Sequence, residues 1–509
     1  MAEGVVVCVD AGTTVIKAVV FDAAGRELRV AQTAAAVRQP SPGCSEQDMH
    51  EVWTAVVATV RAAISGMSWQ VQALAVTAQG DGAWLVDGAG EPVRPAVLWN
   101  DARAVGVVEA WQRQGVLAEA FRRTGSLGNA GLPHAVLTVL RHEEPAVLAR
   151  SRAVLTCGGW LFLRLTGVLG IDRSEASAPW LDLRPDPAAR PLVDLYGLDD
   201  LADLLPPVLT ESERVQGLTA PAAALLGLPV GLPVVIAPYD IAATAVGAGA
   251  TAPGQAVSIL GTTLCTESVL AAGEAVPGPD ATPSGLTLDL GCGGLFLRSF
   301  PTLSGTGVLE WAAGLLDVAD AASVVALAAE AEPGAAGLTV LPYLSPAGER
   351  APFLDTAARG VISGLTFAHR RTHVARAVLE GLAHVVRDCL DATRGSAAEL
   401  RVCGGGAASE VWLQIIADVT GCAVVRTVDS QVGAKGALVV ALTALGHYPD
   451  LPDAAAALVR DRDRREPDAA VRALYEDRHA AFLADRALVA PMWHRRTSAT
   501  VTGQERVGV

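Results

Sequence analysis

Lysine is almost absent from this chain of 509 residues, which contains only Lys17 and Lys435. A phosphate-binding P-loop needs a lysine that follows a glycine and precedes a serine or threonine. Neither lysine has that context, since the first lies in V-I-K-A-V and the second in G-A-K-G-A. If the protein binds ATP, it therefore does so without a P-loop.

Basic residues as a class are outnumbered by acidic ones. The chain has 39 Lys and Arg against 54 Asp and Glu, which gives a formal net charge of −15. Proteins that bind nucleic acids present a basic face to the phosphate backbone. The charge balance therefore argues against a nucleic-acid partner.

Closely spaced cysteines and long apolar runs are missing as well. The eight cysteines are scattered and none form C-x-x-C, which predicts reduced and buried thiols. Polar residues, glycine and proline interrupt the alanine-rich stretches before they reach the length of a membrane span. The N-terminus has no basic segment ahead of an apolar one, so we expect no signal peptide, no membrane partner and a cytoplasmic location.

Material for large buried cores is abundant. Apolar residues make up 51% of the chain and charged residues 18%, and 509 residues exceed what one core usually holds. Strand and helix patterns alternate, with strands expected near 28–36, 73–77 and 232–237 and helices near 49–65 and 242–250. This alternation predicts an α/β fold with at least two domains.

One segment near the N-terminus is repeated near the middle of the chain. Residues 7–20 read V-C-V-D-A-G-T-T-V-I-K-A-V-V, and residues 257–270 read V-S-I-L-G-T-T-L-C-T-E-S-V-L. Both predict a strand, a Gly-Thr-Thr turn and a second strand, so we expect two copies of one α/β unit. We place them at 1–250 and 251–488, followed by a polar, patternless and flexible tail at 489–509.

The Gly-Thr-Thr turns have the chemistry of phosphate binding. Gly12 lets backbone N–H groups approach an anion closely, and Thr13 and Thr14 add hydroxyl donors. Asp10 would repel that anion unless a cation such as Mg²⁺ intervened. A plain hairpin selected for turn geometry is the alternative for the first turn, and the second copy favours phosphate binding.

Further segments, taken with the D-A-G-T-T opening, carry a family resemblance. They are L-W-N-D-A-R (98–103), G-E-R-A-P-F (348–353), A-R-G-V-I-S-G-L (358–365), A-R-A-V-L-E-G (375–381) and C-G-G-G-A-A-S-E-V-W-L-Q-I-I-A-D-V-T-G (403–421). In this order they closely resemble the FGGY carbohydrate kinases over residues 4 to 485. The resemblance implies two duplicated actin-like ATPase domains (the sugar kinase/Hsp70/actin, ribonuclease H-like fold) with a cleft between them. It also implies transfer of the ATP γ-phosphoryl group to a sugar or polyol hydroxyl, with Mg²⁺.

The resemblance assigns roles to individual residues. Asp240 resembles the family's catalytic base, and Asp10 the acid that orients Mg²⁺–ATP through water. Asp240 also directly precedes the helical run 241–250, so an N-cap role is the structural alternative, and both roles can hold. The positions that resemble the family's nucleotide-binding residues are Gly12, Thr13, Thr14, Gly261, Thr262, Gly305, Gly405, Gly406 and Ser409.

The stretch T-A-Q-G-D-G-A-W (77–84) stands where the family contacts the acceptor. Glycerol kinases carry Gln-Arg-Glu there and xylulokinases Gln-Met-His-Gly, so Gly80 and Asp81 depart from both. Asp81 can accept hydrogen bonds from two adjacent hydroxyls, Gly80 and Gly82 make room, and Arg103 is either a polar contact or the structural partner of a carboxylate. The candidate acceptor-binding residues are Gln79, Gly80, Asp81, Trp99, Asn100 and Asp240.

Several functions stay open at this point. The strings Q-G-D-G-x-W-L and D-x-S-E-A-S (172–177) most resemble the erythritol-kinase branch of the family, so an acyclic polyol is the expected substrate. A ketopentose of the L-xylulose or D-xylulose type is the alternative. A catalytically inactive nucleotide-binding regulator and an Hsp70-like ATPase are alternatives of another class. The resemblance is also compatible with a homodimer.

Overall fold

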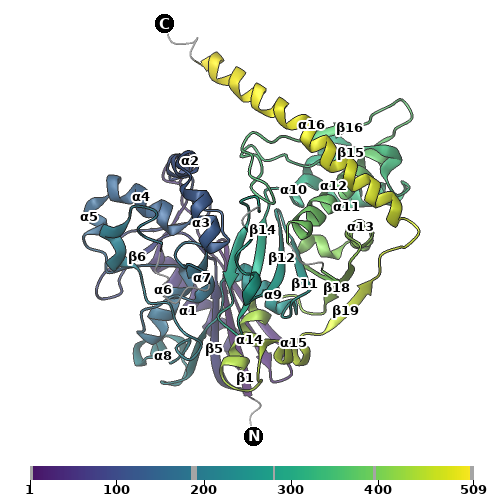
Figure 1. Cartoon of the computed structure of the whole chain (residues 1–509). Coiled ribbons are helices and arrows are strands. Elements are labelled where there is room, and N and C mark those ends of the chain that lie inside the picture. Colours follow the sequence, from purple (N-terminus) through teal and green to yellow (C-terminus); the bar gives the residue numbers. More distant parts are fainter. Residues whose placement is uncertain (1–3, 185–191, 279–280, 394–396, 505–509) are drawn as a thin grey trace. The chain divides into compact units, whose positions relative to one another are not determined.

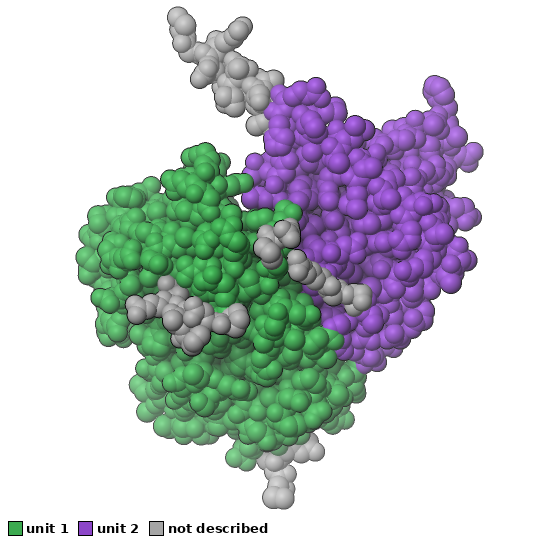
Figure 2. Space-filling view, in the orientation of Figure 1, with its two compact units in different colours: residues 1–253, 269–298, 428–460 green, residues 254–268, 299–427, 461–509 purple. Residues whose placement is uncertain are grey.

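The structure, a computed structural model, describes residues 4–184, 192–278, 281–393 and 397–504. It is an α/β protein, as predicted, and its chain divides into two compact units (Figures 1 and 2). Unit 1 comprises residues 1–253, 269–298 and 428–460, and unit 2 comprises residues 254–268, 299–427 and 461–509.

The first division between the units lies at 253/254, close to the boundary expected at 250/251. The later segments 269–298 and 428–460 nevertheless belong to unit 1, although the predicted boundary would place them in the second domain. An internal repeat shows which segments are similar in sequence, but it does not show which segments pack together in the fold. The division into domains at 1–250 and 251–488 therefore stays a prediction.

The sheet of unit 1 has six strands in the order β3-β2-β1-β5-β10-β9. Strands β1, β2 and β3 form an antiparallel meander, β5 and β10 run parallel to β1, and β9 is antiparallel to β10. The carboxyl ends of β1, β5 and β10 therefore meet at one edge of the sheet. The strands are β1 (Gly4–Ala11), β2 (Val15–Asp22), β3 (Glu27–Ala34), β5 (Gln70–Ala78), β9 (Val215–Gly217) and β10 (Pro233–Ile236).

Both faces of this sheet are covered. Val5, Val7 and Val9 of β1 belong to the apolar core that includes helix α1 (Met49–Ile64). On the other face, helix α14 (Val432–Ala444) packs against β1 and β5. Burial on both sides explains why β1 reads as a continuous apolar run and lacks the alternation of a half-exposed strand.

Helix α14 crosses helix α9 (Asp240–Gly247) at very short range within unit 1. A Cβ added to Gly436 would lie 1.7 Å from the carbonyl oxygen of Ala243, and one added to Gly247 would lie 1.9 Å from that of Val432. Only glycine permits this approach of two backbones. The crossing fixes α9, and with it Asp240, against the sheet.

The second sheet has the order β13-β14-β12-β11-β17-β18-β19. Strands β11 and β12 form an antiparallel hairpin, β17 and β18 follow in parallel, and β19 is antiparallel to β18. This repeats the β2-β1-β5-β10-β9 pattern of the first sheet, so the predicted duplication is confirmed. The strands are β11 (Gln255–Leu260), β12 (Leu264–Ala271), β13 (Leu286–Asp289), β14 (Leu295–Pro301), β17 (Glu399–Cys403), β18 (Ala423–Thr427) and β19 (Asp461–Arg465).

The remaining elements connect or cover these sheets. The short strands are β4 (Glu46–Gln47), β6 (Trp84–Val86), β7 (Ala96–Val97), β8 (Ala153–Leu155), β15 (Thr339–Leu341) and β16 (Val361–Ser363). The other helices of the first half are α2 (Val105–Gln114), α3 (Val116–Thr124), α4 (Pro133–Glu143), α5 (Pro145–Leu148), α6 (Cys157–Thr166), α7 (Arg173–Ser177) and α8 (Ala220–Leu226). Those of the second half are α10 (Gly307–Leu315), α11 (Ala321–Ala329), α12 (Arg371–Asp391), α13 (Glu410–Thr420) and α15 (Leu451–Leu458), with short 3₁₀ turns between elements.

The C-terminal tail differs from expectation. Helix α16 (Arg472–Gln504), yellow in Figure 1, continues through most of the expected tail at 489–509. The last five residues of that tail, 505–509, lie outside the described residues. Pro491 does not end the helix, because tertiary contacts within unit 2 follow it. The ring of Trp493 packs 5.9 Å from that of Tyr343, and His494 Nε2 lies 3.1 Å from Asp355 Oδ2. Packing overrides the weak local signal here.

The predicted burial of the cysteines is confirmed for seven of the eight. All eight thiols are free, and all except the partly exposed Cys44 are buried. In the described part of the chain, no helix combines the length and apolar character that crossing a bilayer requires.

Candidate active site

Three carboxylates gather where β1, β5 and β10 end. Asp10 lies at the end of β1, Asp81 follows β5, and Asp240 follows β10 as the first residue of α9. The ends are held together by backbone hydrogen bonds, from Gln79 N–H to Ala11 O (3.0 Å) and from Ala237 N–H to Val76 O (2.9 Å). In α/β proteins, ligands commonly bind outside the carboxyl ends of parallel strands.

Asp240 has the properties of a general base. Asp240 as a whole is partly exposed, but its carboxylate is buried. This burial, reinforced by the charges of Asp10 and Asp81, raises the pKa of the carboxylate to about 7. A base whose pKa lies near neutral pH accepts a proton more readily than an ordinary carboxylate. The N-cap role expected as an alternative is wrong, because Tyr239 is the N-cap residue and Asp240 already belongs to the helix. The Ile241 N–H donates to Asp240 Oδ1 at 2.7 Å, so the helix start still orients the carboxylate.

Asp10 lies at the same edge and is partly exposed. It is paired across the hairpin with Lys17, and burial raises its pKa while the lysine charge opposes that rise. Its Oδ2 atom lies 3.0 Å from the position that a Cβ on Gly433 would take, so the first turn of α14 approaches the carboxylate. The positive end of a helix favours an anion there.

These buried acids suit a hydrated cation. Burial raises the pKa of both Asp10 and Asp240, and the charge of Asp10 raises the pKa of Asp240 further, so a nearby cation would stabilise the charged forms. Among the described residues, no three His, Cys, Asp or Glu side chains are arranged as a metal cage. Mg²⁺ commonly keeps several waters and takes only one or two carboxylates, so the residues present fit it.

The first Gly-Thr-Thr turn is fixed by side chains. The Thr13 hydroxyl donates to Gln79 Oε1 and accepts from Trp99 Nε1, each at 2.9 Å, and Gln47 Nε2 donates to the Thr13 carbonyl at 2.7 Å. Thr13 therefore holds the shape of the turn with its side chain. Gly12 is partly exposed and Thr14 is exposed, so both are accessible at the surface of the turn.

Gln79 and Gly80 do not have the surroundings expected of acceptor-binding residues. Gln79 is buried, and its amide connects Thr13 with Gln47, to which its Nε2 donates at 2.7 Å. The space beside Gly80 belongs to Tyr239, whose Cδ2 would lie 2.2 Å from an added Cβ. The space beside Gly82 likewise belongs to the Val97 carbonyl oxygen, at 2.3 Å. The expectation that these glycines make room for a substrate is therefore wrong.

Asp81 faces the acid cluster from a strained backbone. Its φ is 55°, in the left-handed region where Asp is among the few side chains found regularly. Its charge contributes to the raised pKa values of Asp240 and Glu175, which places its carboxylate near both. Strain of this kind is typical of functional positions.

The L-W-N-D-A-R segment divides into exposed and structural residues. Trp99 and Asn100 are exposed, so both can contact a ligand. Asp101 is buried and accepts from Arg103 Nε at 2.8 Å, and Arg103 Nη2 also reaches Glu46 at 2.6 Å. Arg103 is therefore the structural partner of carboxylates, one of the two roles left open by the sequence.

Unit 2 contains the second Gly-Thr-Thr turn, between β11 and β12. Thr306 N–H donates to the Gly261 carbonyl at 2.9 Å, and a Cβ on Gly305 would lie 2.5 Å from the Thr262 carbonyl oxygen. The backbone of Gly305 thus packs directly against the turn. The buried Glu349 holds the segment before Gly305, since it accepts from Leu303 N–H at 2.7 Å and from the Ser304 hydroxyl at 2.9 Å.

A pocket of about 470 Å³ lies beside this turn within unit 2. Gly405, Gly406 and Ser409 are among the residues that line it. The glycines begin a 3₁₀ turn, and the helix proper starts one residue after Ser409, whose hydroxyl caps it by accepting from Trp412 N–H at 3.1 Å. The other residues of the lining are Thr306, Leu309, Glu310, Ala321, Ala322, Val325, Ala408, Glu410, Val411 and Trp412.

Some residues of the site were not singled out by the sequence. Gln47 completes the network around Thr13, and Glu349 supports the second turn. Glu175 is buried beside Gly158, and burial, with charge from Asp172 and Asp81, raises its pKa to about 8. The D-x-S-E-A-S and G-E-R-A-P-F strings contain the last two, so the available signal was polar residues within recognised motifs.

Comparison with known proteins agrees with this geometry. Residues 5–247 match the N-terminal domain and residues 302–445 the C-terminal domain of the FGGY family of carbohydrate kinases. The chain therefore belongs to the FGGY family of carbohydrate kinases. It is a phosphotransferase that acts on an alcohol group, and ATP is the family's phosphate donor.

Individual relatives cover nearly the whole chain. An erythritol kinase of Brucella abortus (strain 2308) is 31% identical, over 97% of this chain and 98% of its own. An L-xylulose/3-keto-L-gulonate kinase of Escherichia coli (strain K12) is 29% identical, over 93% of this chain and 95% of its own. The crystal structure of a xylulose kinase from Rhodospirillum rubrum is similar with a TM-score of 0.85 and 30% identity, over 96% of this chain and all of that one.

Substitution of Gly406 by alanine should raise the KM for ATP roughly tenfold. The added Cβ would lie 2.4 Å from Trp412 Cζ3 and displace the lining of the pocket, and overpacking typically costs about 1–3 kcal/mol. Steady-state kinetics with varied ATP measure this. Gly314→Ala, on α10 of the same unit with open space around its Cβ, is the control and should leave the KM unchanged. Equal behaviour of the two variants would remove the loop from nucleotide binding.

Proposed function

We propose that the protein transfers the γ-phosphoryl group of ATP to a hydroxyl of an acyclic polyol, erythritol or a similar alditol. The observation that supports this most is the acid cluster at the edge of the unit 1 sheet, with a partly exposed Asp240 whose pKa is raised to about 7. The acceptor preference is supported by Asp81, which can accept from two adjacent hydroxyls, and by the similarity to an erythritol kinase.

In the proposed mechanism, Asp240 takes the proton of the attacking hydroxyl of the acceptor. The oxygen of that hydroxyl forms a bond to the γ-phosphorus. The bond between that phosphorus and the bridging oxygen breaks, and ADP leaves with the electron pair. Such transfers depend mainly on positioning and on neutralising phosphate charge. Asp10 would hold Mg²⁺ through water, and the cation would supply charge neutralisation at the phosphates.

The phosphate and nucleotide ligands are assigned to the turns and the pocket. We propose that Gly12, Thr13 and Thr14 of unit 1 and Gly261 and Thr262 of unit 2 contact phosphate, chiefly through backbone N–H groups. The pocket beside Gly305, lined by Gly405, Gly406 and Ser409, takes the nucleoside.

The acceptor is assigned to unit 1. We propose that Asp81 and Asn100 hydrogen-bond its hydroxyls and that the exposed indole of Trp99 covers one side of it. Gln79 contributes by holding Thr13 and Trp99 in place. Carboxylate and amide groups can accept hydrogen bonds from the hydroxyls of a neutral polyol.

A ketopentose such as L-xylulose is the second candidate acceptor. The similarity to an L-xylulose/3-keto-L-gulonate kinase and to a xylulose kinase structure favours it. An inactive nucleotide-binding regulator is less well supported, because both Asp10 and Asp240 are present and a protein without turnover needs no base.

A coupled ADP-release assay over a panel of alditols and ketopentoses tests this function. We expect the highest kcat/KM with erythritol or another acyclic alditol and low turnover with L-xylulose and D-xylulose. A preference for a ketopentose would replace the acceptor and leave the kinase assignment intact. Absence of turnover with every acceptor, together with retained ATP binding, would favour the regulator.

Two further properties belong to this proposal. The eight free thiols support a reducing, cytoplasmic location. A homodimer, compatible with the family, stays a prediction that light scattering of the purified protein can test.

A further inference from the structure

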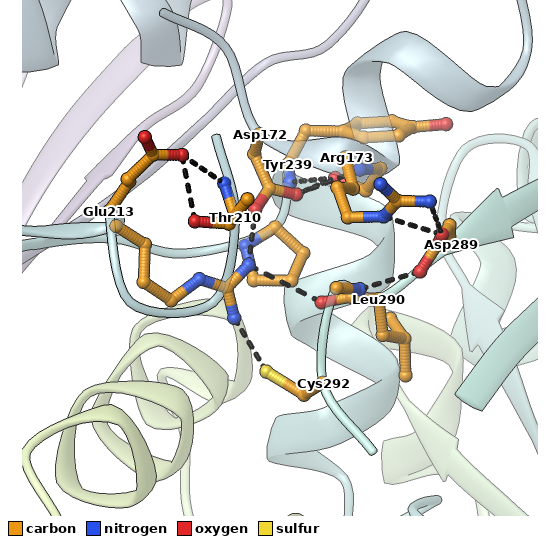
Figure 3. Close-up of polar contacts among 12 residues, drawn as sticks. Asp172, Arg173, Thr210, Glu213, Tyr239, Asp289, Leu290 and Cys292 are labelled. Carbon is orange, nitrogen blue, oxygen red and sulfur yellow. Dashed lines mark hydrogen bonds and ion pairs between the residues drawn. The ribbon is translucent and has the colours of Figure 1, made fainter. Parts of the chain in front are cut away.

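A serine hydroxyl connects helix α7 with the residue before the base. The N–H of Tyr239 donates to Ser174 Oγ at 3.1 Å, and the Ser174 hydroxyl donates to Asp172 Oδ1 at 2.6 Å. Figure 3 labels Tyr239 and Asp172, the two partners of this serine. Tyr239 is the N-cap residue of α9, and Asp240 follows it directly. The hydrogen bond therefore acts on the backbone that carries the Asp240 carboxylate.

A buried ion pair orients this serine. Asp172 accepts the Ser174 N–H at 2.9 Å with one oxygen and binds the guanidinium of Arg214 with the other. Arg214 in turn contacts the Cys292 thiol, and its Nη2 lies 3.4 Å from the Leu290 carbonyl. The side chains of Asp172 and Arg214 are each 1% exposed, so the pair is shielded from water and its geometry is well defined.

The other contacts of the same turn are also specific. The Thr77 hydroxyl donates to the Pro238 carbonyl at 2.7 Å, and the Tyr239 ring lies against Gly80. Proline has no N–H, so the amide of Tyr239 is the donor that immediately precedes helix α9. Residues 238 and 239 are therefore held by two hydrogen bonds, one from Thr77 to the Pro238 carbonyl and one from the Tyr239 N–H to Ser174.

We propose that Ser174, oriented by the Asp172–Arg214 pair, is a positioning residue that sets the place of the Asp240 carboxylate. This inference rests on the proposed role of Asp240 as the base. A base must lie within hydrogen-bond reach of the hydroxyl it deprotonates, and a misplacement of about 1 Å can cost 10²-fold in rate. Loss of the Ser174 hydroxyl should therefore lower kcat more than it changes either KM.

Ser177 provides a matched control on the same helix. It is buried like Ser174, and its hydroxyl also accepts a backbone N–H, that of Asp289 at 3.0 Å. The two serines differ in the amide they hold. A purely structural role for Ser174 predicts that Ser174→Ala and Ser177→Ala behave alike.

The test compares kcat, both KM values and Tm of the two variants in the full-length enzyme. We expect Ser174→Ala to lose about 10- to 100-fold in kcat with both KM values within twofold of wild type, and Ser177→Ala to keep its kcat within twofold. Equal kcat values in the two variants would overturn the proposal. If Ser174→Ala does not fold, Ser174→Cys replaces it, because a thiol is of similar size and is only a weak acceptor. A wild-type kcat in that folded variant, with a crystal structure showing that the hydrogen bond from the Tyr239 N–H is absent, would equally overturn the proposal.

A double-mutant cycle separates this proposal from the assignment of the base. Adding Ser174→Ala to Asp240→Asn should cause little further loss of the residual rate, because the positioned group is already gone. A full multiplicative loss would show that Ser174 acts elsewhere. If Asp240→Asn alone keeps the wild-type rate, the base assignment fails and the present proposal fails with it, whereas failure of the serine test leaves the base in place.

Discussion

Replacement of Asp240 by asparagine should lower kcat about 10²- to 10⁴-fold, the usual contribution of one positioned general base. Asparagine has the same shape and can still accept the Ile241 N–H, so the start of α9 should be preserved. The variant loses the negative charge of the carboxylate and, with it, the capacity to take a proton. The KM for the polyol should change little, because the acceptor residues in the proposal remain.

Asp182→Asn is the matched control for this substitution. Asp182 is another buried carboxylate of unit 1, paired with Arg123 and Arg184 by hydrogen bonds of 2.8 and 2.7 Å and without a proposed role. Its variant should keep the wild-type kcat, whatever it does to stability. Near-wild-type turnover of Asp240→Asn under the same assay would remove Asp240 from the mechanism.

Replacement of Asp10 by asparagine should lower activity by about 10- to 100-fold, the range found when a group that holds a metal through its outer shell is lost. The variant should need more Mg²⁺ for half-maximal rate, because a neutral amide attracts the hydrated cation less. The fold should persist, since removing a buried charge with a raised pKa relieves electrostatic repulsion from Asp240. Titration of the rate with Mg²⁺ at saturating ATP measures both effects.

Asp22→Asn serves as the control at the other end of the same hairpin. Asp22 pairs with Val5 in the strand register and binds Arg26 at 2.6 Å, away from the carboxyl end of β1. Its variant should show the wild-type dependence on Mg²⁺. An equal shift in both variants would mean that the Asp10 effect reflects a disturbed hairpin.

The sequence predicted the parts of the molecule that depend on local pattern. Two Gly-Thr-Thr turns between apolar runs were enough to expect both hairpins, and the structure has them at β1–β2 and β11–β12. An apolar strand followed by Pro-Tyr-Asp and small residues was enough to expect a strand and helix around Asp240, now β10 and α9. In each case the signal and the structure occupy the same few residues.

The sequence failed where the partner of a residue lies far along the chain. Gly80 was expected to leave space for a substrate, but the ring of Tyr239, the N-cap residue of α9, fills that space. The tail was expected to lack structure, but Trp493 packs on Tyr343 and the helix continues. Ser174 belongs to a recognised motif, but its hydrogen bond with Tyr239 was not predicted, because the two residues are 65 positions apart in the sequence. Such pairings follow from the folded topology and leave no local trace.

A crystal of the enzyme with erythritol and a non-hydrolysable Mg²⁺–ATP analogue tests the account most directly. We predict that one hydroxyl oxygen of the polyol lies within hydrogen-bond distance of the Asp240 carboxylate, about 2.6–3.2 Å. A well-ordered polyol bound with all of its hydroxyls beyond the reach of Asp240 would contradict the account.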